Sequence, residues 1–322
     1  MYHHFLADLA STGPILLVAA LGVFVVVLDA FRNDDAAIPW IAGLGMAVAA
    51  GFQMLAIGEG RTAFDGQVFV GGPAAVANVI ILIGAIASVA LTVPYLSRIG
   101  RNYGEVHALI LFATAGMMTL ASAGSLVTLF VGLETMSVCL YVLTGLVREE
   151  STANESALKY FLLGAFSTGF FLYGLALLYG ATGTMDLTGL AAGLEETGRN
   201  GLFLAGVGLL LVGFFFKVSA VPFHMWTPDV YEGAPLPITA YISATAKAAI
   251  FALMVPLFGV ALLPVIDDWQ WMLASLSVAT MVVGNLVALQ QTNIKRLLAY
   301  SSISQVGFML MAITTISDAS SS

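Results

Sequence analysis

The stretch LLLVGFFFKVSAVPFHMW, residues 209–226, places a lysine and a proline inside an apolar run that is long enough to cross a membrane. About 20 predominantly apolar residues span the hydrocarbon core of a bilayer as a helix. Pro222 lacks a backbone donor and clashes with the preceding turn, so a helix is expected to break there. Freed backbone groups inside a membrane are tolerated only where they line a cavity or lie within protein. The sequence therefore predicts a membrane helix that is broken between about Val218 and Trp226.

The composition of the whole chain is that of a membrane protein. Of its 322 residues, 59% are hydrophobic and 9% are charged, and the mean hydropathy is +0.96. Soluble domains are about 45–50% apolar and about 25% charged, and disordered chains are polar and rich in charge. No polar stretch is longer than a loop, which excludes a single anchor attached to a large soluble domain. We therefore predict an all-α polytopic membrane protein.

Apolar runs between polar breaks predict ten transmembrane helices. Residues 108–147 are too long for one crossing, so two spans are inferred there, with a turn from Ser122 to Ser125. The predicted spans cover residues 13–31, 38–57, 74–97, 106–122, 125–147, 156–181, 201–221, 236–264, 270–290 and 297–316.

Basic residues in the loops predict the orientation, because loops rich in Lys and Arg stay in the cytoplasm. Most of them lie in odd-numbered loops, which places those loops in the cytoplasm and the N-terminus outside, in the periplasm. The N-terminus lacks a basic region and a small-residue cleavage site, so the first span is expected to be retained. The odd-numbered loops hold Arg32, Arg98, Arg101, Arg148, Lys295 and Arg296, and the even-numbered loops hold Arg61 and Arg199.

Several function classes are disfavoured by charge and by metal-ligand content. The net charge of −8, from 11 basic and 19 acidic residues, gives no basic surface for nucleic acid. Cys139 is the one cysteine, so neither an internal disulfide nor a thiolate-bound cluster is expected in this chain. The four histidines, His3, His4, His107 and His224, lack the spacing of haem or zinc ligands. The sequence thus predicts no metal or redox cofactor in this chain.

Ionisable residues inside the predicted spans are the strongest functional signal. Lys217 precedes Pro222 by five residues, Lys247 lies near the centre of the eighth span, and Glu134 lies deep in the fifth. Each costs roughly 2.5–3.5 kcal/mol at mid-helix, so such groups normally face a protein interior or a water path. Their simpler interpretations are a packing ion pair for Lys247, a snorkelling side chain for Lys217 and a neutral hydrogen-bonded acid for Glu134.

A proton path would explain these residues together. Broken helices beside ionisable groups mark ion paths in transporters. Burial favours the neutral amine of a lysine and a nearby carboxylate favours the ammonium, so a lysine whose partner moves takes up or releases a proton. We predict that Glu134 approaches Lys217 and that Lys247 is the next residue along the path.

Two further residues are more ambiguous. His224 follows the proline, where it is equally typical of a hydrogen-bonding residue at the membrane interface. Lys159 begins the sixth span four residues after Glu155, and an interfacial i,i+4 ion pair explains it nearly as well as transport does.

Four stretches of the sequence resemble a known family. The third of them is highly specific, the four together cover roughly residues 105–310, and residues 1–100 match only in hydropathy. The family is that of subunit N of the bacterial proton-pumping NADH:quinone oxidoreductase (respiratory complex I), an antiporter-like membrane subunit. The stretches are LFVGLETMSVCLYVLTG (129–145), ESALKYFLLGAFSTGFFLYGLALLYGATGT (155–184), FFFKVSAVPFHMWTPDVYEGAPLPITAYISATAKAA (214–249) and NLVALQQTNIKRLLAYSSISQVGFML (285–310).

The resemblance implies a fold and a division of the chain. Family members have fourteen helices with two inverted five-helix repeats, helices 4–8 and 9–13. By this resemblance, residues 1–104 hold helices 1–3, residues 105–264 form the first repeat with its proton half-channel, and residues 265–322 begin the second. The charged twelfth helix, which completes the path in the family, is expected to be absent from this sequence.

The resemblance also implies a function and a set of site residues. It suggests a proton-translocating subunit of a translocase in the bacterial inner membrane, with the nicotinamide, flavin, iron–sulfur and quinone sites in partner subunits. The partners would be other membrane-arm subunits and, through them, the redox arm. A cation/proton antiporter subunit or a membrane-bound hydrogenase subunit of the same fold is the alternative. The residues implied in the proton path are Glu134, Lys159, Lys217, His224 and Lys247.

Overall fold

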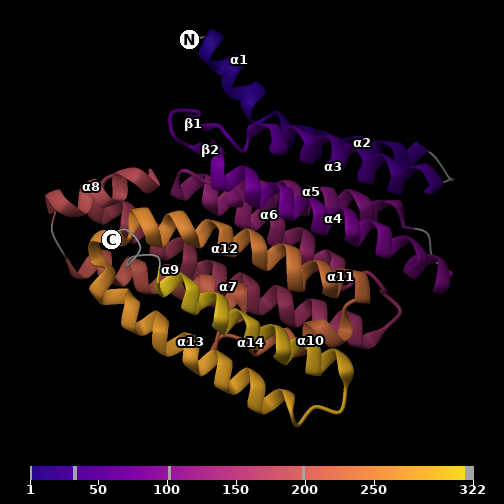
Figure 1. Ribbon diagram of the computed structural model, residues 1–322. Coiled ribbons are helices and arrows are strands. Elements are labelled where there is room, and N and C mark those ends of the chain that lie inside the picture. Colours follow the sequence, from indigo (N-terminus) through magenta and orange to yellow (C-terminus); the bar gives the residue numbers. More distant parts are fainter. Residues whose placement is uncertain (1, 32–34, 101–102, 198–199, 316–322) are drawn as a thin grey trace. The chain divides into compact units, whose positions relative to one another are not determined.

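The computed structural model describes residues 2–31, 35–100, 103–197 and 200–315 (Figure 1). The chain forms two compact units, each assembled from two separate segments. Unit 1 comprises Met1–Glu149 and Ala234–Ala252, and unit 2 comprises Glu150–Gly233 and Leu253–Ser322. The predicted break and the residues up to Gly233 therefore belong to unit 2, whereas the eighth span begins in unit 1.

Unit 1 is built around long apolar helices. Helix α2 packs against α3 and α5, α3 packs against α4, and α5 packs against α6. Gly116 and Gly132 let α5 and α6 approach closely, since an added Cβ on either would lie 2.6 Å from a backbone nitrogen of the other helix. The elements are α1 (Tyr2–Ser11), α2 (Gly13–Phe31), a 3-10 turn (Asp35–Ala37), α3 (Ile38–Ala56), β1 (Gly60–Ala63), β2 (Val68–Gly71), α4 (Gly72–Arg98), α5 (Gly104–Ala121), α6 (Leu126–Thr144), α11 (Leu236–Tyr241) and a π-helical turn (Ile242–Ala246).

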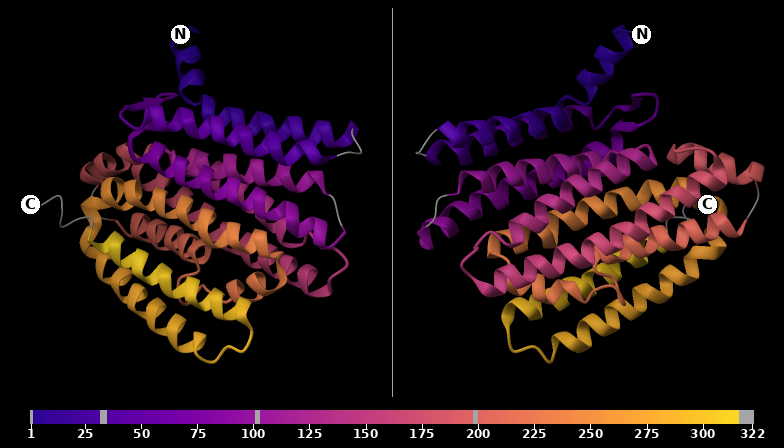
Figure 2. Two further views of the ribbon diagram at one scale, coloured as in Figure 1. Left: turned by 45° about the vertical axis from the view of Figure 1, so that its right-hand side comes forward. Right: turned by 180° about the vertical axis from the view of Figure 1, so that it is seen from behind.

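Unit 2 contains the broken helix and the last two spans. Helices α7 and α9 pack together, α10 packs against α7 and α14, and α13 and α14 run side by side in both views of Figure 2. Helix α12 (Lys247–Pro256) starts in unit 1 and ends in unit 2. The other elements are α7 (Ser151–Thr182), α8 (Leu187–Thr197), α9 (Gly201–Val218), α10 (Trp226–Gly233), a π-helical turn (Leu257–Ala261), a 3-10 turn (Leu263–Val265), α13 (Ile266–Ala288) and α14 (Ile294–Thr314).

The predicted helical membrane architecture is confirmed. Ten helical stretches within the described residues are long and apolar enough to cross a membrane. The predicted turn from Ser122 to Ser125 lies between the end of α5 and the start of α6. Large apolar side chains such as Trp40, Phe31 and Phe166 are strongly exposed, as lipid-facing side chains are.

Three features were not predicted. Helices α1 and α8 are too short to register as spans, and α8 lies between the predicted spans 156–181 and 201–221. The strands β1 and β2 form an antiparallel hairpin with Arg61 opposite Val70. The π-helical turns lie within and at the end of the eighth span.

Candidate functional site

The seventh span is broken, as predicted. Helix α9 ends at Val218, and Ser219 adopts a left-handed conformation with φ of 70°. The chain then runs without regular helix to Trp226, where α10 begins, and the Val221–Pro222 peptide bond is cis. Pro222 thus lies in the middle of the break.

Side chains form hydrogen bonds with two backbone groups at the break. The Trp226 indole nitrogen donates to the Phe216 carbonyl at 2.9 Å. The Val221 backbone nitrogen donates to Thr280 Oγ1 on α13 at 3.0 Å, and Thr227 donates to the Ser219 hydroxyl at 2.6 Å. The first two bonds involve backbone groups at the break, which are costly to leave unpaired in an apolar environment, and the third joins two side chains. The break is consequently a defined structure.

Lys217 lies in the last turn of α9 with only 6% of its surface exposed. The carbonyl end of a helix carries partial negative charge and stabilises a nearby cation by roughly 0.3–1 kcal/mol, or more where the site is partly buried. Lys217 is therefore a basic residue in the part of α9 where the helix dipole favours positive charge. The structure places Lys217 directly beside the break.

His224 lies inside the break and is half-buried. Its ring centroid is 6.5 Å from that of Tyr300 on α14, in an edge-to-face arrangement. Within the described part of the chain, the buried Nδ1 atom of His224 has no hydrogen-bond partner. A ring nitrogen in this state is able to accept a hydrogen bond or a proton.

In unit 1, Lys247 directly follows the π-helical turn Ile242–Ala246 and is 4% exposed. Single π-helical turns inside helices occur frequently at functional sites. Just before this turn, the Tyr241 hydroxyl lies 2.7 Å from Thr114 Oγ1 and 3.2 Å from the Ile110 carbonyl of α5. The π-turn changes the helical register at Lys247, and the sequence carried no signal for it.

Glu134 lies on α6 in unit 1 and is half-buried. Lys217 belongs to unit 2. The pairing of these two residues therefore stays a prediction.

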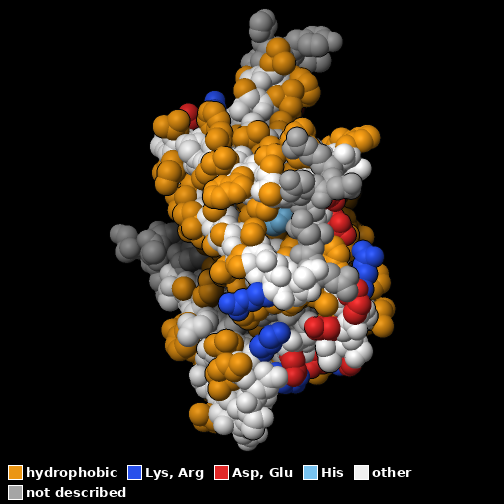
Figure 3. Space-filling view, turned by 90° about the vertical axis from the view of Figure 1, so that its right-hand side faces the viewer, with side chains coloured by type: hydrophobic (Ala, Val, Ile, Leu, Met, Phe, Trp, Pro, Cys, Tyr) orange, Lys and Arg blue, Asp and Glu red, His pale blue; other side chains and the backbone are white. Residues whose placement is uncertain are grey.

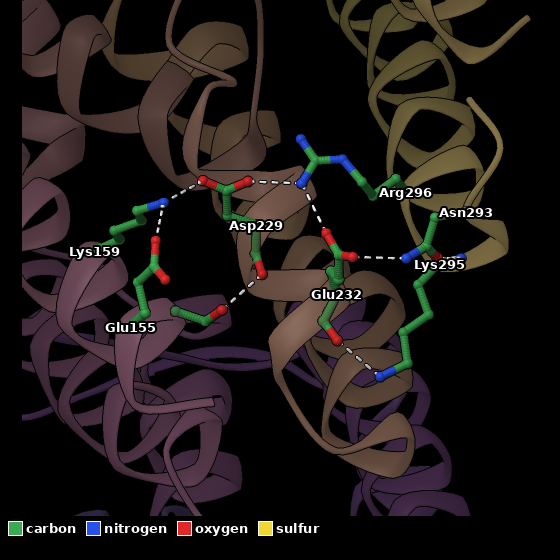
Figure 4. Close-up of polar contacts among 8 residues, drawn as sticks. Glu155, Lys159, Asp229, Glu232, Asn293, Lys295 and Arg296 are labelled. Atoms are coloured by element: carbon green, nitrogen blue, oxygen red, sulfur yellow. Dashed lines mark hydrogen bonds and ion pairs between the residues drawn. The ribbon is translucent and has the colours of Figure 1, made fainter. Parts of the chain in front are cut away.

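Lys159 lies in an ion cluster near the start of α7 (Figure 4). Its ammonium contacts Glu155 Oε1 at 2.7 Å and Asp229 Oδ2 at 2.9 Å. The 32 residues of α7 extend about 48 Å, which is longer than the roughly 30 Å of a hydrocarbon core. The pair with Glu155 is the one that the i,i+4 spacing predicted. The contact with Asp229 was missed, because it joins residues that are 70 positions apart.

Asp229 links three helices through its carboxylate. Its Oδ1 atom accepts from Arg296 on α14 at 2.8 Å, and Arg296 also contacts Glu232 of α10 at 2.8 Å. Burial opposes ionisation of Asp229, but the hydrogen bonds and charges of Lys159 and Arg296 outweigh it and hold the pKa of Asp229 below its ordinary value. Figure 3 shows acidic and basic side chains gathered together on this end of the molecule.

Other contacts strengthen the same junction. Asn293, which caps α14, donates to Glu232 Oε1 at 2.7 Å, and Lys295 donates to the Glu232 carbonyl at 2.8 Å. Ser156 of α7 donates to the Asp229 carbonyl at 2.8 Å. Helix α10, which directly follows the break, is thereby fixed to α7 and to α14.

No cluster of three or more His, Cys, Asp or Glu side chains suited to a metal ion occurs within the described ranges. Cys139 is a buried free thiol. The described spans and their ends thus carry titratable side chains, which can hold or pass on protons.

A polytopic helical fold with a broken helix and with lysines buried in its spans is typical of ion-transporting membrane proteins. The chain belongs to the family described as NADH:quinone oxidoreductase/Mrp antiporter, TM, whose profile matches residues 123–321.

Two curated relatives are named NADH-quinone oxidoreductase subunit N. The protein from Salinibacter ruber is 53% identical over 309 residues, which cover 95% of this chain and 62% of the relative. The protein from Trichlorobacter lovleyi is 45% identical over 308 residues, which cover 94% of this chain and 63% of the relative. The chain spans a little over three-fifths of the length of these relatives.

Solved structures of related assemblies share the fold. A chain of respiratory complex I from Thermus thermophilus is 37% identical, with a TM-score of 0.79 over 93% of this chain and 64% of that chain. A chain of an archaeal membrane-bound sulfane sulfur reductase is 25% identical, with a TM-score of 0.83 over 95% and 64%. A chain of the Mrp complex from Dietzia is 21% identical and shows the fold alone, with a TM-score of 0.81 over 95% and 59%.

Proposed function

We propose that this chain translocates protons as part of subunit N of a bacterial NADH:quinone oxidoreductase. The observation that carries the proposal is Lys217, a buried lysine in the last turn of a helix that ends at a break, where side chains bond to the backbone. The identity of 53% and 45% with relatives of that name supports the particular complex. The chain would then be a subunit of a translocase.

The proton path that we propose runs through Glu134, Lys217, His224 and Lys247, with Lys159 at its polar end. Lys217 and Lys247 are buried in their spans, and His224 offers a ring nitrogen within the break. Loss of a carboxylate partner would favour release of a lysine proton, and its return would favour uptake. Lys159 is held by two carboxylates, so its role would be to maintain a fixed charge where protons reach the spans.

The same proposal assigns the redox chemistry to partner subunits of the complex. Oxidation of NADH and the flavin, iron–sulfur and quinone chemistry would occur in partner subunits, and other membrane-arm subunits would transmit the energy. Residues 105–264 would form the first repeat, with residues 1–104 before it and the start of the second repeat after it. The basic loops favour an inner-membrane orientation with the N-terminus in the periplasm.

The alternative is a cation/proton antiporter or hydrogenase subunit of the same fold. The identity of 37% with a complex I chain, against 21% with an Mrp chain, favours the first reading.

The test of the proposed function is NADH-driven proton uptake by inverted membrane vesicles that carry the full protein with Lys217→Met. We expect fewer protons per NADH while the complex remains assembled, because the variant removes the titratable group and keeps an unbranched side chain. An unchanged ratio of protons to NADH would contradict the proposal. Arg61→Met, in the hairpin between α3 and α4, removes an exposed cation outside the spans and serves as the matched control.

A further inference from the structure

A groove in unit 1 lies between α3 and α4 and has a volume of about 990 Å³. Apolar side chains from both helices line it, among them Trp40 and Leu44 of α3 and Val93 of α4. Trp40 is 72% exposed, so the groove is open along its side. Ser97 and His107 supply polar groups to its lining. The groove belongs to the part of the chain that lies outside the matched family profile.

The length of the groove corresponds to one leaflet of a bilayer. Its lining residues fall within residues 36–47 and 86–100. The first stretch begins, and the second ends, at the same membrane surface. At 1.5 Å per helical residue these stretches extend roughly 18–22 Å. Half of a bilayer, headgroups included, measures about 20–22 Å. The groove therefore runs from the headgroup region to about the middle of the membrane.

An arginine is adjacent in sequence to the residues that line one end of the groove. Ser97 and Gly100 line it, and Arg98, which lies between them in sequence, ends α4 with an exposed side chain. No carboxylate in the described part of the chain pairs with Arg98. Basic sites between transmembrane helices near the membrane surface attract anionic lipid headgroups.

We propose that this groove is a binding site for one anionic phospholipid, with an acyl chain between α3 and α4 and its phosphate at Arg98. A transmembrane helix of a partner subunit fits less well, because it would run through both leaflets and needs a channel about 10 Å wide along its whole length. A volume of about 990 Å³ is at the upper end of ligand pockets, which measure about 300–1,000 Å³. The site is independent of the proposed proton path.

Gly43 provides the means to test the site. It lines the groove, and a Cβ added there would have no atom within 4 Å. Gly43→Phe can therefore fill the groove without a clash in the backbone. Gly51→Phe is the matched control, because Gly51 lies on the same helix, has equally open surroundings and does not line the groove.

The experiment uses membranes that contain the full protein in its assembly, treated with photoactivatable phosphatidylglycerol or with phosphatidylcholine that carries the same reactive acyl chain. After irradiation, labelled peptides are mapped by mass spectrometry. We expect residues 36–47 and 86–100 to be labelled several-fold more by the anionic probe. Gly43→Phe should abolish this excess, Gly51→Phe should leave it unchanged, and Arg98→Gln should make the two probes equal.

Three results would overturn the proposal. Equal labelling by both probes in the unchanged protein would mean that only bulk lipid lies against these helices. Labelling that Gly43→Phe does not alter would place the lipid outside the groove. A cross-link from this segment to a partner subunit, in place of lipid, would mean that protein fills the groove.

Discussion

Replacement of Lys247 by methionine should stop the passage of protons through this chain without preventing assembly. Lys247 is 4% exposed within the eighth span. A lysine at the centre of a membrane helix costs roughly 2.5–3.5 kcal/mol on insertion scales, and methionine removes that cost while it keeps a similar shape. The variant should therefore accumulate in the membrane at least as well as the parent protein.

Lys247→Arg separates charge from protonation. The pKa of arginine lies far above neutrality, so at pH 7 its side chain stays protonated. A residue that must release its proton in each cycle would then slow by several orders of magnitude, although the positive charge is retained. A residue that acts only as a fixed charge would tolerate arginine and not methionine.

The assay is NADH-driven proton uptake by inverted vesicles, followed with a pH-sensitive dye, with NADH oxidation and complex assembly measured in the same preparation. Both variants should lower the ratio of protons to NADH. Normal uptake with Lys247→Met would show that Lys247 is a packing residue and would refute the reasoning. If methionine abolished uptake and arginine kept it in full, Lys247 would act as a fixed charge and would not release and take up protons.

Four further outcomes are expected. Glu134→Gln and Lys217→Met should each lower proton uptake. The double variant should lose no more uptake than the worse single variant, because the two residues are predicted to act as a pair. Additive losses in the same vesicles would argue against pairing. Asp229→Asn should make amide hydrogen exchange in residues 226–233 several-fold faster, whereas Glu155→Gln should have little effect there, because Lys159 keeps its contact with α10; equal exchange in both variants would contradict a link through Asp229. Because the pKa of Asp229 is lowered in the folded protein, its contribution to stability is fully present above the ordinary aspartate pKa of about 3.9. This contribution is lost as the pH falls through the pKa of the folded protein. Amide exchange in α10, corrected for intrinsic rates, should therefore accelerate only in acid, and Asp229→Asn should show no such acceleration. Gly233→Ala should lower the amount of assembled protein, since an added Cβ would lie 2.0 Å from Ser156 Oγ and 2.6 Å from the Thr152 carbonyl and such overpacking costs about 1–3 kcal/mol; Gly43→Ala, with open space around it, should be neutral in the same immunoblot.

The membrane spans and the break were predictable because their signals are local. Hydrophobic run length sets the number of crossings, and Pro222 removes a donor and clashes with the turn before it. The pair of Lys159 with Glu155 was equally local, since residues four apart lie on one face of a helix.

Other features have weaker local signals or none. The hairpin could have been found, because Asp65 and Gly66 form a typical turn sequence between two short strands. The π-turn before Lys247 could not, because no residue in ISATA distinguishes an i→i+5 bond from the usual helical bond. The Asp229 junction joins α7, α10 and α14, and one sequence gives no information about which distant helices meet.

The most direct measurement of the central claim is gentle extraction of the full, tagged protein from its native membrane, followed by assay of what remains bound. The account predicts that NADH:quinone reductase activity and iron–sulfur signals co-purify with the chain in a constant ratio. Co-purification with hydrogenase or sodium-transport activity, and without NADH:quinone reductase, would contradict it.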